Sequence, residues 1–311
     1  MTDILLNKNL EPLREFIDDL NFKEIVINEP YHLHIETIRG EWIHKENDKL
    51  SVAYLYGLSK LLAVKEGKRF NEGAPILAAT IDGKHRVNVV FGKQTNHDIS
   101  IAIRLKRNSK LDLNSFDISE NDKLELINLV KQKKNILISG GTGTGKTTLL
   151  NSLVKFIDPL DRIITIENVR EIEIDPKVHK NSTALNYLED NPDSIAALLN
   201  ASLRMRPDRI LIGELRSENS NVFLRASNTG HEGTISTIHA SSPNGAITAL
   251  IHNIKSSSKS AHDEHQLKKE IMQSLDAVIQ LTREYRDGEM IVKGSLRKKE
   301  ARAVASTEVL S

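Results

Sequence analysis

The strongest constraint on how this 311-residue chain can fold is a glycine-rich run flanked by two apolar segments. It reads Ile136-Leu137-Ile138-Ser139-Gly140-Gly141-Thr142-Gly143-Thr144-Gly145-Lys146-Thr147-Thr148 and matches the G-x-x-x-x-G-K-[ST] pattern of a phosphate-binding loop. The apolar residues 136–138 predict a buried parallel strand, and the amphipathic residues 147–157 predict a helix. This order of strand, loop and helix favours a parallel α/β sheet with the loop at its edge.

The residue types in this loop suit the binding of a nucleoside triphosphate. Glycines let the backbone curl until its N–H groups point inward at an anion, and the start of the helix adds partial positive charge. Lys146 can reach the β- and γ-phosphates of ATP, and the hydroxyl of Thr147 can ligate Mg²⁺. We therefore expect the nucleotide to contact Gly141, Thr142, Gly143, Thr144, Gly145, Lys146, Thr147 and Thr148.

Composition excludes several other classes of protein and site. The chain has no cysteine, which excludes disulfides and cysteine-ligated zinc and fits a cytoplasmic location. No stretch approaches the roughly 18 apolar residues of a membrane span, and Met1–Ile4 lacks the features of a signal peptide. A net charge of +1 gives no general case for nucleic-acid binding. The basic segment Leu296–Arg302 is either a solvated tail or a docking patch for a partner or anionic lipid.

The order of predicted elements divides the chain into three parts. Residues 1–105 group their elements as in a smaller α+β domain, with helices at 10–20 and 52–64 and strands at 23–27, 32–38, 75–81, 85–91 and 98–104. Residues 106–119 are polar and are expected to form a linker. Residues 120–311 alternate short strands with helices, which predicts an α/β domain with a mostly parallel sheet. Its expected strands are 135–139, 162–166, 209–213, 234–238, 277–281 and 290–293, with helices at 147–157, at 194–204 and ending near 228.

Two acidic residues follow predicted strands of this sheet. Glu214 comes directly after the strand 209–213, and Glu167 comes directly after the strand 162–166. Open parallel sheets bind their ligands at the carboxyl edge, where these two side chains are expected. A carboxylate there can orient an attacking water or hold Mg²⁺ through water. Glu214 is therefore the candidate catalytic carboxylate and Glu167 a second candidate, whereas the structural alternative for each is a plain acid at a strand end.

A further polar cluster surrounds the predicted strand 234–238. Thr234, Ser236 and His239 lie at or near its end, where a γ-phosphate could be sensed. His231 and His239 are too far apart along an extended strand to share a metal ion. We expect a nucleotide-sensing or catalytic-support role for His239, against the alternative of a structural histidine.

These four segments, in this order, resemble the Walker A motif, acidic box, Walker B motif and His box of the secretion ATPase superfamily of P-loop motors. Within that superfamily they resemble the VirB-type traffic ATPases of type IV secretion and conjugation systems. The stretches Leu203–Arg209, Gly213–Arg216 and Asn228–Gly233 carry this resemblance. It is strong over residues 130–255, weaker but present upstream, and fades beyond 258.

The resemblance implies a RecA-like P-loop NTPase domain, a PAS-like N-terminal domain that packs over the nucleotide, and a hexameric ring. It also implies that Arg86 and Arg104 of the N-terminal domain reach the phosphates, with Arg204 and Arg206 as further candidates for phosphate or intersubunit contacts. In the strands 85–91 and 98–104 the apolar residues alternate with the arginine, so each arginine should lie opposite the apolar face. The alternative is a surface arginine on a half-exposed strand.

The chain departs from these families in three ways. The acidic box usually reads Glu-Asp, but here it reads Glu167-Asn168, which weakens the case for metal binding by this box. Type II secretion relatives commonly carry a four-cysteine zinc module, and this chain has no cysteine, which argues against that branch. The guanine-specificity motif N-K-x-D is also missing, since Asn7-Lys8-Asn9-Leu10 fails at its last position, and this disfavours a GTPase.

We therefore predict a homohexameric ATPase that hydrolyses Mg-ATP to power or gate transport or assembly in a type IV secretion or conjugative transfer system. Expected partners are copies of itself, inner-membrane components and other ATPases of the apparatus, with no sequence-specific nucleic-acid binding. It would be cytoplasmic and peripherally associated with the inner membrane. Three alternatives stay open at this point. They are a type IV pilus assembly or retraction motor, a nucleotide-dependent scaffold with little turnover, and a small-molecule P-loop kinase.

Overall fold

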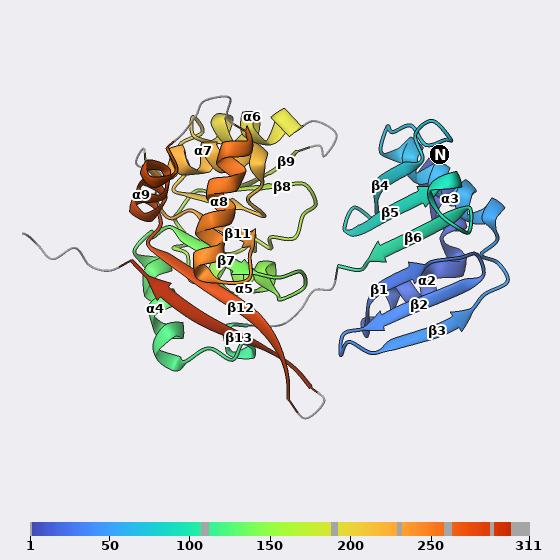
Figure 1. The fold of residues 1–311 in the computed structure, drawn as a ribbon, viewed down its shortest axis with the longest axis horizontal. Coiled ribbons are helices and arrows are strands. Elements are labelled where there is room, and N and C mark those ends of the chain that lie inside the picture. The colour runs from blue at the N-terminus through green and yellow to red at the C-terminus, as the bar shows by residue number, and fades with distance from the viewer. Residues whose placement is uncertain are drawn as a thin grey trace, which may run out of the picture. The chain divides into compact units, whose positions relative to one another are not determined.

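The computed structural model describes residues 2–106, 112–187, 192–228, 232–257, 263–286 and 289–299, which form two compact units (Figure 1). The first unit contains the described residues up to 106 together with Val169–Glu171, and the second contains nearly all of the others. The boundaries at 105 and 119 expected from the sequence stay a prediction. None of the helices in the described ranges is long and apolar enough to cross a membrane.

The first unit is a six-stranded antiparallel sheet with helices on one face, in the strand order β3-β2-β1-β6-β5-β4. Its strands alternate buried apolar and more exposed residues, as Ile99, Ile101 and Ile103 illustrate. The buried side chains form one core with the leucines of α3. The elements are α1 (Thr2–Asn9), α2 (Glu11–Asp18), β1 (Phe22–Ile27), β2 (His32–Thr37), β3 (Trp42–Glu46), α3 (Val52–Lys65), β4 (Ile76–Ile81), β5 (His85–Phe91), η1 (Gly92–Gln94) and β6 (Ile99–Arg104).

Two arginines of this sheet lie directly opposite each other. Strands β5 and β6 pair antiparallel with Arg86 opposite Arg104 and Val87 opposite Ile103. Directly opposed residues project from the same face of a sheet, and Val87 and Ile103 are both buried in the core. Arg86 and Arg104 therefore share the face that turns away from the core, as the alternation of apolar residues predicted.

The second unit contains a seven-stranded sheet in the order β13-β12-β7-β11-β10-β8-β9. The pairings that join β12, β7, β11, β10, β8 and β9 are parallel, so the carboxyl ends of these six strands meet at one edge. Its strands are β7 (Ile136–Gly140), β8 (Ile163–Glu167), β9 (Ser182–Asn186), β10 (Arg209–Ile212), β11 (Ile235–His239), β12 (Ala277–Arg286) and β13 (Glu289–Lys298). Its helices are η2 (Leu113–Ser115), α4 (Glu120–Lys131), α5 (Lys146–Val154), α6 (Pro192–Ser202), α7 (Ser217–Asn228), α8 (Pro243–Ser257) and α9 (Glu264–Ser274).

Helices cover both faces of this mostly parallel sheet (Figure 1). The alternation along β7 shows why: Leu137 packs with residues of α6, α7, α8 and α9, whereas Ile136 and Ile138 pack with residues of α4 and α5. Strands that are buried on both sides have no polar face, which explains their continuous apolar runs. The predicted α/β class with a smaller α+β domain before it is confirmed.

The structure corrects several local expectations. The helix expected at 10–20 is the shorter α2, and Pro12 stands in its first turn, where a residue without an N–H is tolerated. The helix α1 before it was not expected. Strands β3 and β9 were not expected. Both lie at sheet edges, and all five residues of β3 are exposed, so no alternation marks it. The last two strands also run further than the expected 277–281 and 290–293.

Candidate functional site

The glycine loop lies between β7 and α5, as the sequence predicted. Gly143 and Gly145 have φ angles of +68° and +80°, in the left-handed region that side chains strain to adopt. Gly145 is the N-cap of α5, and Lys146 is the first residue of that helix. The first N–H groups of a helix have no partner within it, so they face the loop with a partial positive charge. The loop is thus already shaped to bind an anion.

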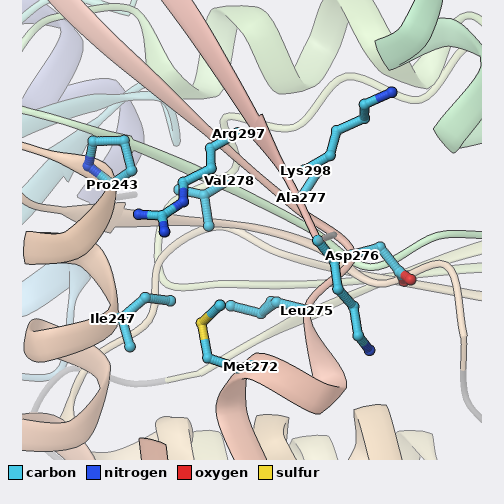
Figure 2. Close-up of a pocket in the computed structure, with 10 residues that line it drawn as sticks. Pro243, Ile247, Met272, Leu275, Asp276, Ala277, Val278, Arg297 and Lys298 are labelled. Carbon is cyan, nitrogen blue, oxygen red and sulfur yellow. The ribbon is translucent and has the colours of Figure 1, made fainter. Parts of the chain in front are cut away.

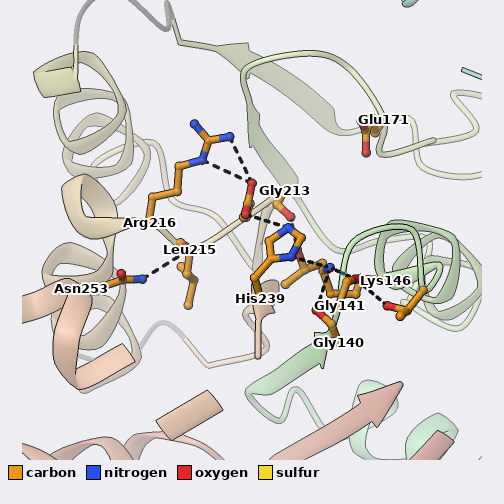
Figure 3. A network of polar contacts seen from close by, with 12 residues as sticks. Gly140, Gly141, Lys146, Glu171, Gly213, Leu215, Arg216, His239 and Asn253 are labelled. Atoms are coloured by element: carbon orange, nitrogen blue, oxygen red, sulfur yellow. Dashed lines mark hydrogen bonds and ion pairs between the residues drawn. The ribbon is translucent and has the colours of Figure 1, made fainter. Parts of the chain in front are cut away.

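Lys146 is buried at the mouth of the loop. Its Nζ donates to the carbonyl oxygens of Gly140 at 3.0 Å and Gly141 at 2.8 Å, and lies 3.4 Å from Nδ1 of His239 (Figure 3). These contacts tie the ammonium to the carboxyl ends of two neighbouring parallel strands, β7 and β11, whose last residues pair in register. The structure therefore brings Lys146 and His239 together. The sequence predicted that His239 lies near the nucleotide, but not that it contacts this lysine.

Glu214 stands next to this pair at the carboxyl edge of the sheet. Its Oε1 lies 3.2 Å from Nε2 of His239, and its Oε2 accepts from Nη2 of Arg216 at 3.2 Å (Figure 3). Its backbone carbonyl accepts from Nδ2 of Asn219 at 2.8 Å. A continuous polar chain therefore runs from Lys146 through His239 to Glu214 and Arg216.

Sequence reasoning missed Arg216 and Asn219. Asn219 lies in the first turn of α7, and its Oδ1 accepts from the backbone N–H of Arg216 at 2.8 Å, in the manner of a helix cap. The spacing Glu214-x-Arg216-x-x-Asn219 was the available signal, because it places a basic residue and a capping amide at the start of a helix that follows the carboxylate.

Glu167 is the last residue of β8 and is almost wholly buried. Its Oε1 accepts from the backbone N–H of Ile172 at 2.9 Å. Its side chain also lies against Gly213, where an added Cβ would come within 3.2 Å of Glu167 Cγ. The structure therefore brings Glu167 beside the Gly213-Glu214 step, while one of its oxygens supports the following loop.

The hydroxyls of β11 support the neighbouring strand. Ser236 Oγ donates to the carbonyl of Ile212 at 2.9 Å, and Thr237 Oγ1 donates to the carbonyl of Gly213 at 2.7 Å. Thr234 is buried before the start of β11, and His239 alone of the three expected polar residues stands at the carboxyl edge. Thr237, which the sequence analysis did not select, fixes the backbone from which Glu214 projects. His231 lies outside the described residues.

The comparison with protein families decides the identity of the chain. A family model described as "Type II/IV secretion system protein" matches residues 81–307. The chain belongs to this family. A secretion-family relative from Bartonella quintana (strain Toulouse), the type IV secretion system protein VirB11, is 32% identical over 323 aligned residues, covering 90% of this chain and 89% of the relative.

Solved structures of secretion ATPases have the same fold. The VirB11 ATPase from the Brucella suis type IV secretion system, in complex with sulphate, is 25% identical with a TM-score of 0.50 and covers 94% of each chain. The pilus retraction motor PilT with bound ADP has a TM-score of 0.66 at 22% identity, covering 94% of this chain and 83% of the motor. The second likeness shows the fold alone. The predicted resemblance to the secretion ATPase superfamily is confirmed.

The arginines that the family resemblance singled out lie in different places. Arg86 is about one-third exposed, and its Nη2 lies 2.8 Å from Oε1 of Glu171, which belongs to the same unit. Arg104 is exposed. Arg204 and Arg206 are also exposed, and they precede β10, so they approach the amino end of that strand rather than its carboxyl edge. Their contacts with phosphates stay a prediction.

The oxygen donors beside the loop fit Mg²⁺ better than a softer metal. The hydroxyl of Thr147 and the carboxylates of Glu214 and Glu167 belong to residues at one edge of the sheet. Magnesium prefers oxygen ligands and usually binds with few protein groups, because substrate phosphates and water complete its shell. Across the ranges that the structure describes, no cluster of three or more histidines and acids could hold a metal by itself.

A small groove lies elsewhere in the second unit (Figure 2). Its walls come from the first half of α8, the end of α9, the start of β12 and the end of β13. Arg297 and Lys298 line it, so part of the basic segment expected near 296–302 borders this groove. None of the predicted nucleotide-site residues lines it.

Proposed function

We propose that this chain is a traffic ATPase that binds ATP with Mg²⁺ and hydrolyses it to power or gate transport or assembly in a type IV secretion or conjugative transfer system. The polar chain from Lys146 through His239 to Glu214, beside a preformed phosphate loop, carries this proposal. Only the imidazole of His239 separates the carboxylate of Glu214 from the loop lysine, so this carboxylate is placed to act on a water near the γ-phosphate. The 32% identity to a type IV secretion system protein supports the assignment of this ATPase to such a secretion system.

Each residue of the site has a part in the proposed reaction. Lys146 neutralises charge on the transferring phosphoryl group, Glu214 draws the proton of the attacking water, and His239 holds the two in register. Mg²⁺ offsets the phosphate charge when it is bound, and Thr147 is the residue to hold it, with Glu214 acting through water and Glu167 as a further candidate. The loop residues Gly141, Thr142, Gly143, Thr144, Gly145 and Thr148 surround the phosphates.

The proposal extends to assembly and location. Arg86 and Arg104 act as arginine-finger-like donors to the phosphates, which would make hydrolysis depend on the position of the N-terminal unit. The chain forms a homohexameric ring and works with inner-membrane components and other ATPases of a secretion apparatus. It works in the cytoplasm, at the periphery of the inner membrane, without reading nucleic-acid sequence.

Phosphate release from ATP tests this proposal directly. The wild type should release phosphate in the presence of Mg²⁺, and Lys146→Ala should lower the rate by about 10²-fold or more. Lys155→Ala, which removes an exposed lysine from the end of the same helix, should leave the rate unchanged. Light scattering with a non-hydrolysable ATP analogue should give a molar mass of six chains, as expected for a hexameric ring. Negligible turnover by the wild type would favour the scaffold instead, and a stable monomer would contradict the ring.

A further inference from the structure

Arg283 on the C-terminal strand β12 contacts the phosphate loop. Its Nε donates to the carbonyl oxygen of Gly143 at 2.8 Å, and its Nη2 donates to the same oxygen. The register of the sheet explains this contact. β12 pairs parallel to β7 with Leu281 opposite Gly140, so Arg283 lies two residues beyond the end of β7, alongside the loop.

The fit between Arg283 and the loop is tight. A Cβ added at Gly143 would overlap the guanidinium of Arg283. Gly143 is therefore required twice, once for its left-handed backbone and once for the approach of this side chain. No residue nearer in the sequence donates to this carbonyl through a side chain in the described part of the chain.

The consequence for the nucleotide follows from the planarity of the peptide bond. The carbonyl of Gly143 and the N–H of Thr144 belong to one trans peptide and point in opposite directions. When Arg283 holds the carbonyl on the outside of the loop, the N–H of Thr144 must point to the inside. There it makes only a 3.5 Å contact, with the carbonyl of Gly141 across the loop. A phosphate oxygen is a stronger acceptor for that N–H, because its charge strengthens the bond.

The strand β13, which lies beside the strand that carries Arg283, is itself anchored. Asp117, in the segment before α4, donates its N–H to Val292 of β13 at 2.9 Å and accepts from the N–H of Gly294 at 3.0 Å. The adjacent Phe116 is buried and packs against Gly145, the second left-handed glycine of the loop. The two strands and this segment thus hold Gly143 and Gly145 from outside, which pre-orients the loop before any ligand arrives.

We propose that Arg283 is a positioning residue for nucleotide binding, which aims the backbone N–H of Thr144 at the phosphates by fixing the Gly143–Thr144 peptide. This inference rests on the proposed function, because it assigns a part to a residue outside the recognised motif. It concerns affinity rather than chemistry, since Arg283 contacts a backbone oxygen and not the γ-phosphate side of the loop.

Titration of the full-length protein with a fluorescent ATP analogue and Mg²⁺ tests the proposal. Arg283→Ala should raise the Kd of the analogue and the KM for ATP by about 10- to 100-fold, while kcat at saturating ATP changes less than about threefold. Arg283→Gln, which keeps a donor without the charge, should recover part of this loss. Arg286→Ala should match the wild type, because Arg286 lies on the opposite face of the same strand. Its half-exposed side chain lies 3.0 Å from Glu284 and 3.7 Å from the carboxylate of Asp117, whose anchoring bonds to β13 are made by the backbone.

The outcomes separate this inference from the proposed function. A wild type that binds and hydrolyses ATP, with Arg283→Ala and Arg286→Ala giving the same Kd and KM, would overturn the role of Arg283 alone. A wild type that does not bind the analogue would overturn both proposals. If Arg283→Ala unfolds in a thermal melt, the Kd and KM of Arg283→Gln decide: values raised above those of Arg286→Ala support the role, and equal values overturn it.

Discussion

His239 Nε2 lies 3.2 Å from Glu214 Oε1, and the other ring nitrogen of His239 lies 3.4 Å from the ammonium of Lys146. One imidazole therefore bridges the cation of the phosphate loop and the carboxylate at the end of the next strand. The bridge forms because β11, which ends in His239, runs parallel between β7 and β10. The spacing of the two charged groups is thus set by the sheet, and each of the three side chains can be tested by itself.

Replacing Glu214 with Gln should stop hydrolysis without stopping nucleotide binding. The amide keeps the size of the side chain but cannot take a proton from water, so kcat should fall by about 10²–10⁴-fold. Phosphate release and titration with an ATP analogue measure the two effects separately. Glu218→Gln, four residues further along and in the first turn of α7, is the matched control and should behave like the wild type. Equal rates in the two variants would remove Glu214 from the reaction.

Replacing His239 with Ala should break the bridge and lower kcat by about 10²-fold, because Lys146 and Glu214 lose the group that holds them in register. Gln at this position can donate and accept at once, and it should restore part of the rate. The exposed His252 of α8 provides the control, and its replacement by Ala should have no effect on phosphate release. A rate in His239→Ala equal to that of His252→Ala would show that the bridge is structural only.

Replacing Asp161 with Asn should destabilise the fold. Oδ2 of Asp161 accepts from Nε of the wholly buried Arg209 at 2.7 Å, and Oδ1 lies 2.7 Å from Nζ of Lys133. Loss of the charge leaves a buried guanidinium without its counter-ion, so the free energy of unfolding in urea should fall by about 3–5 kcal/mol. Asp208→Asn, at a half-exposed acid 3.6 Å from the same lysine, should cost less than about 1 kcal/mol.

The same ion pair predicts how stability depends on pH. Burial acts to raise the pKa of Asp161, but hydrogen bonds from Lys133 and Arg209 outweigh it and hold the pKa below its ordinary value of 3.8. The unfolded chain therefore takes up this proton first as the pH falls. The contribution of Asp161 is complete above the ordinary carboxyl pKa and is lost in more acid solution, as the pH falls through the folded value. Urea unfolding at a series of acid pH values should show a steeper loss for the wild type than for Asp161→Asn.

Two glycines of the N-terminal unit should respond oppositely to replacement by Ala. Gly57 lies in the middle of α3 and an added Cβ there meets nothing within 4 Å, so Gly57→Ala should raise the free energy of unfolding by about 0.5–1 kcal/mol. Gly67 follows the same helix with a φ of +66°, so Gly67→Ala should lower it by about 1–2 kcal/mol. Urea unfolding of both variants measures the difference. The same sign for both changes would contradict the backbone geometry of this helix and its end.

The parts of the fold that could be predicted are those with a local pattern. The strand β7, its loop and α5 follow from apolar residues, glycines and Lys146 within one short run. The edge strands β3 and β9 could not be predicted, because neither alternates buried and exposed residues: all five residues of β3 are exposed, and none of those in β9 is buried. The contact of Arg283 with Gly143 spans 140 residues and depends on the register of β12 against β7, which no local pattern records.

The antiparallel register that sets Arg86 opposite Arg104 places the two positively charged side chains side by side on one face of the sheet, as a linked pair. Neither arginine can change its position on the sheet unless the hydrogen bonds between β5 and β6 break, so both groups must approach or leave any anion together. An insertion of one residue in β6 between Ile103 and Arg104 would turn Arg104 toward the core and separate the pair of arginines, although every side chain would still be present. The number of residues in β6 therefore determines the pairing of these two positive charges as much as the arginines themselves do.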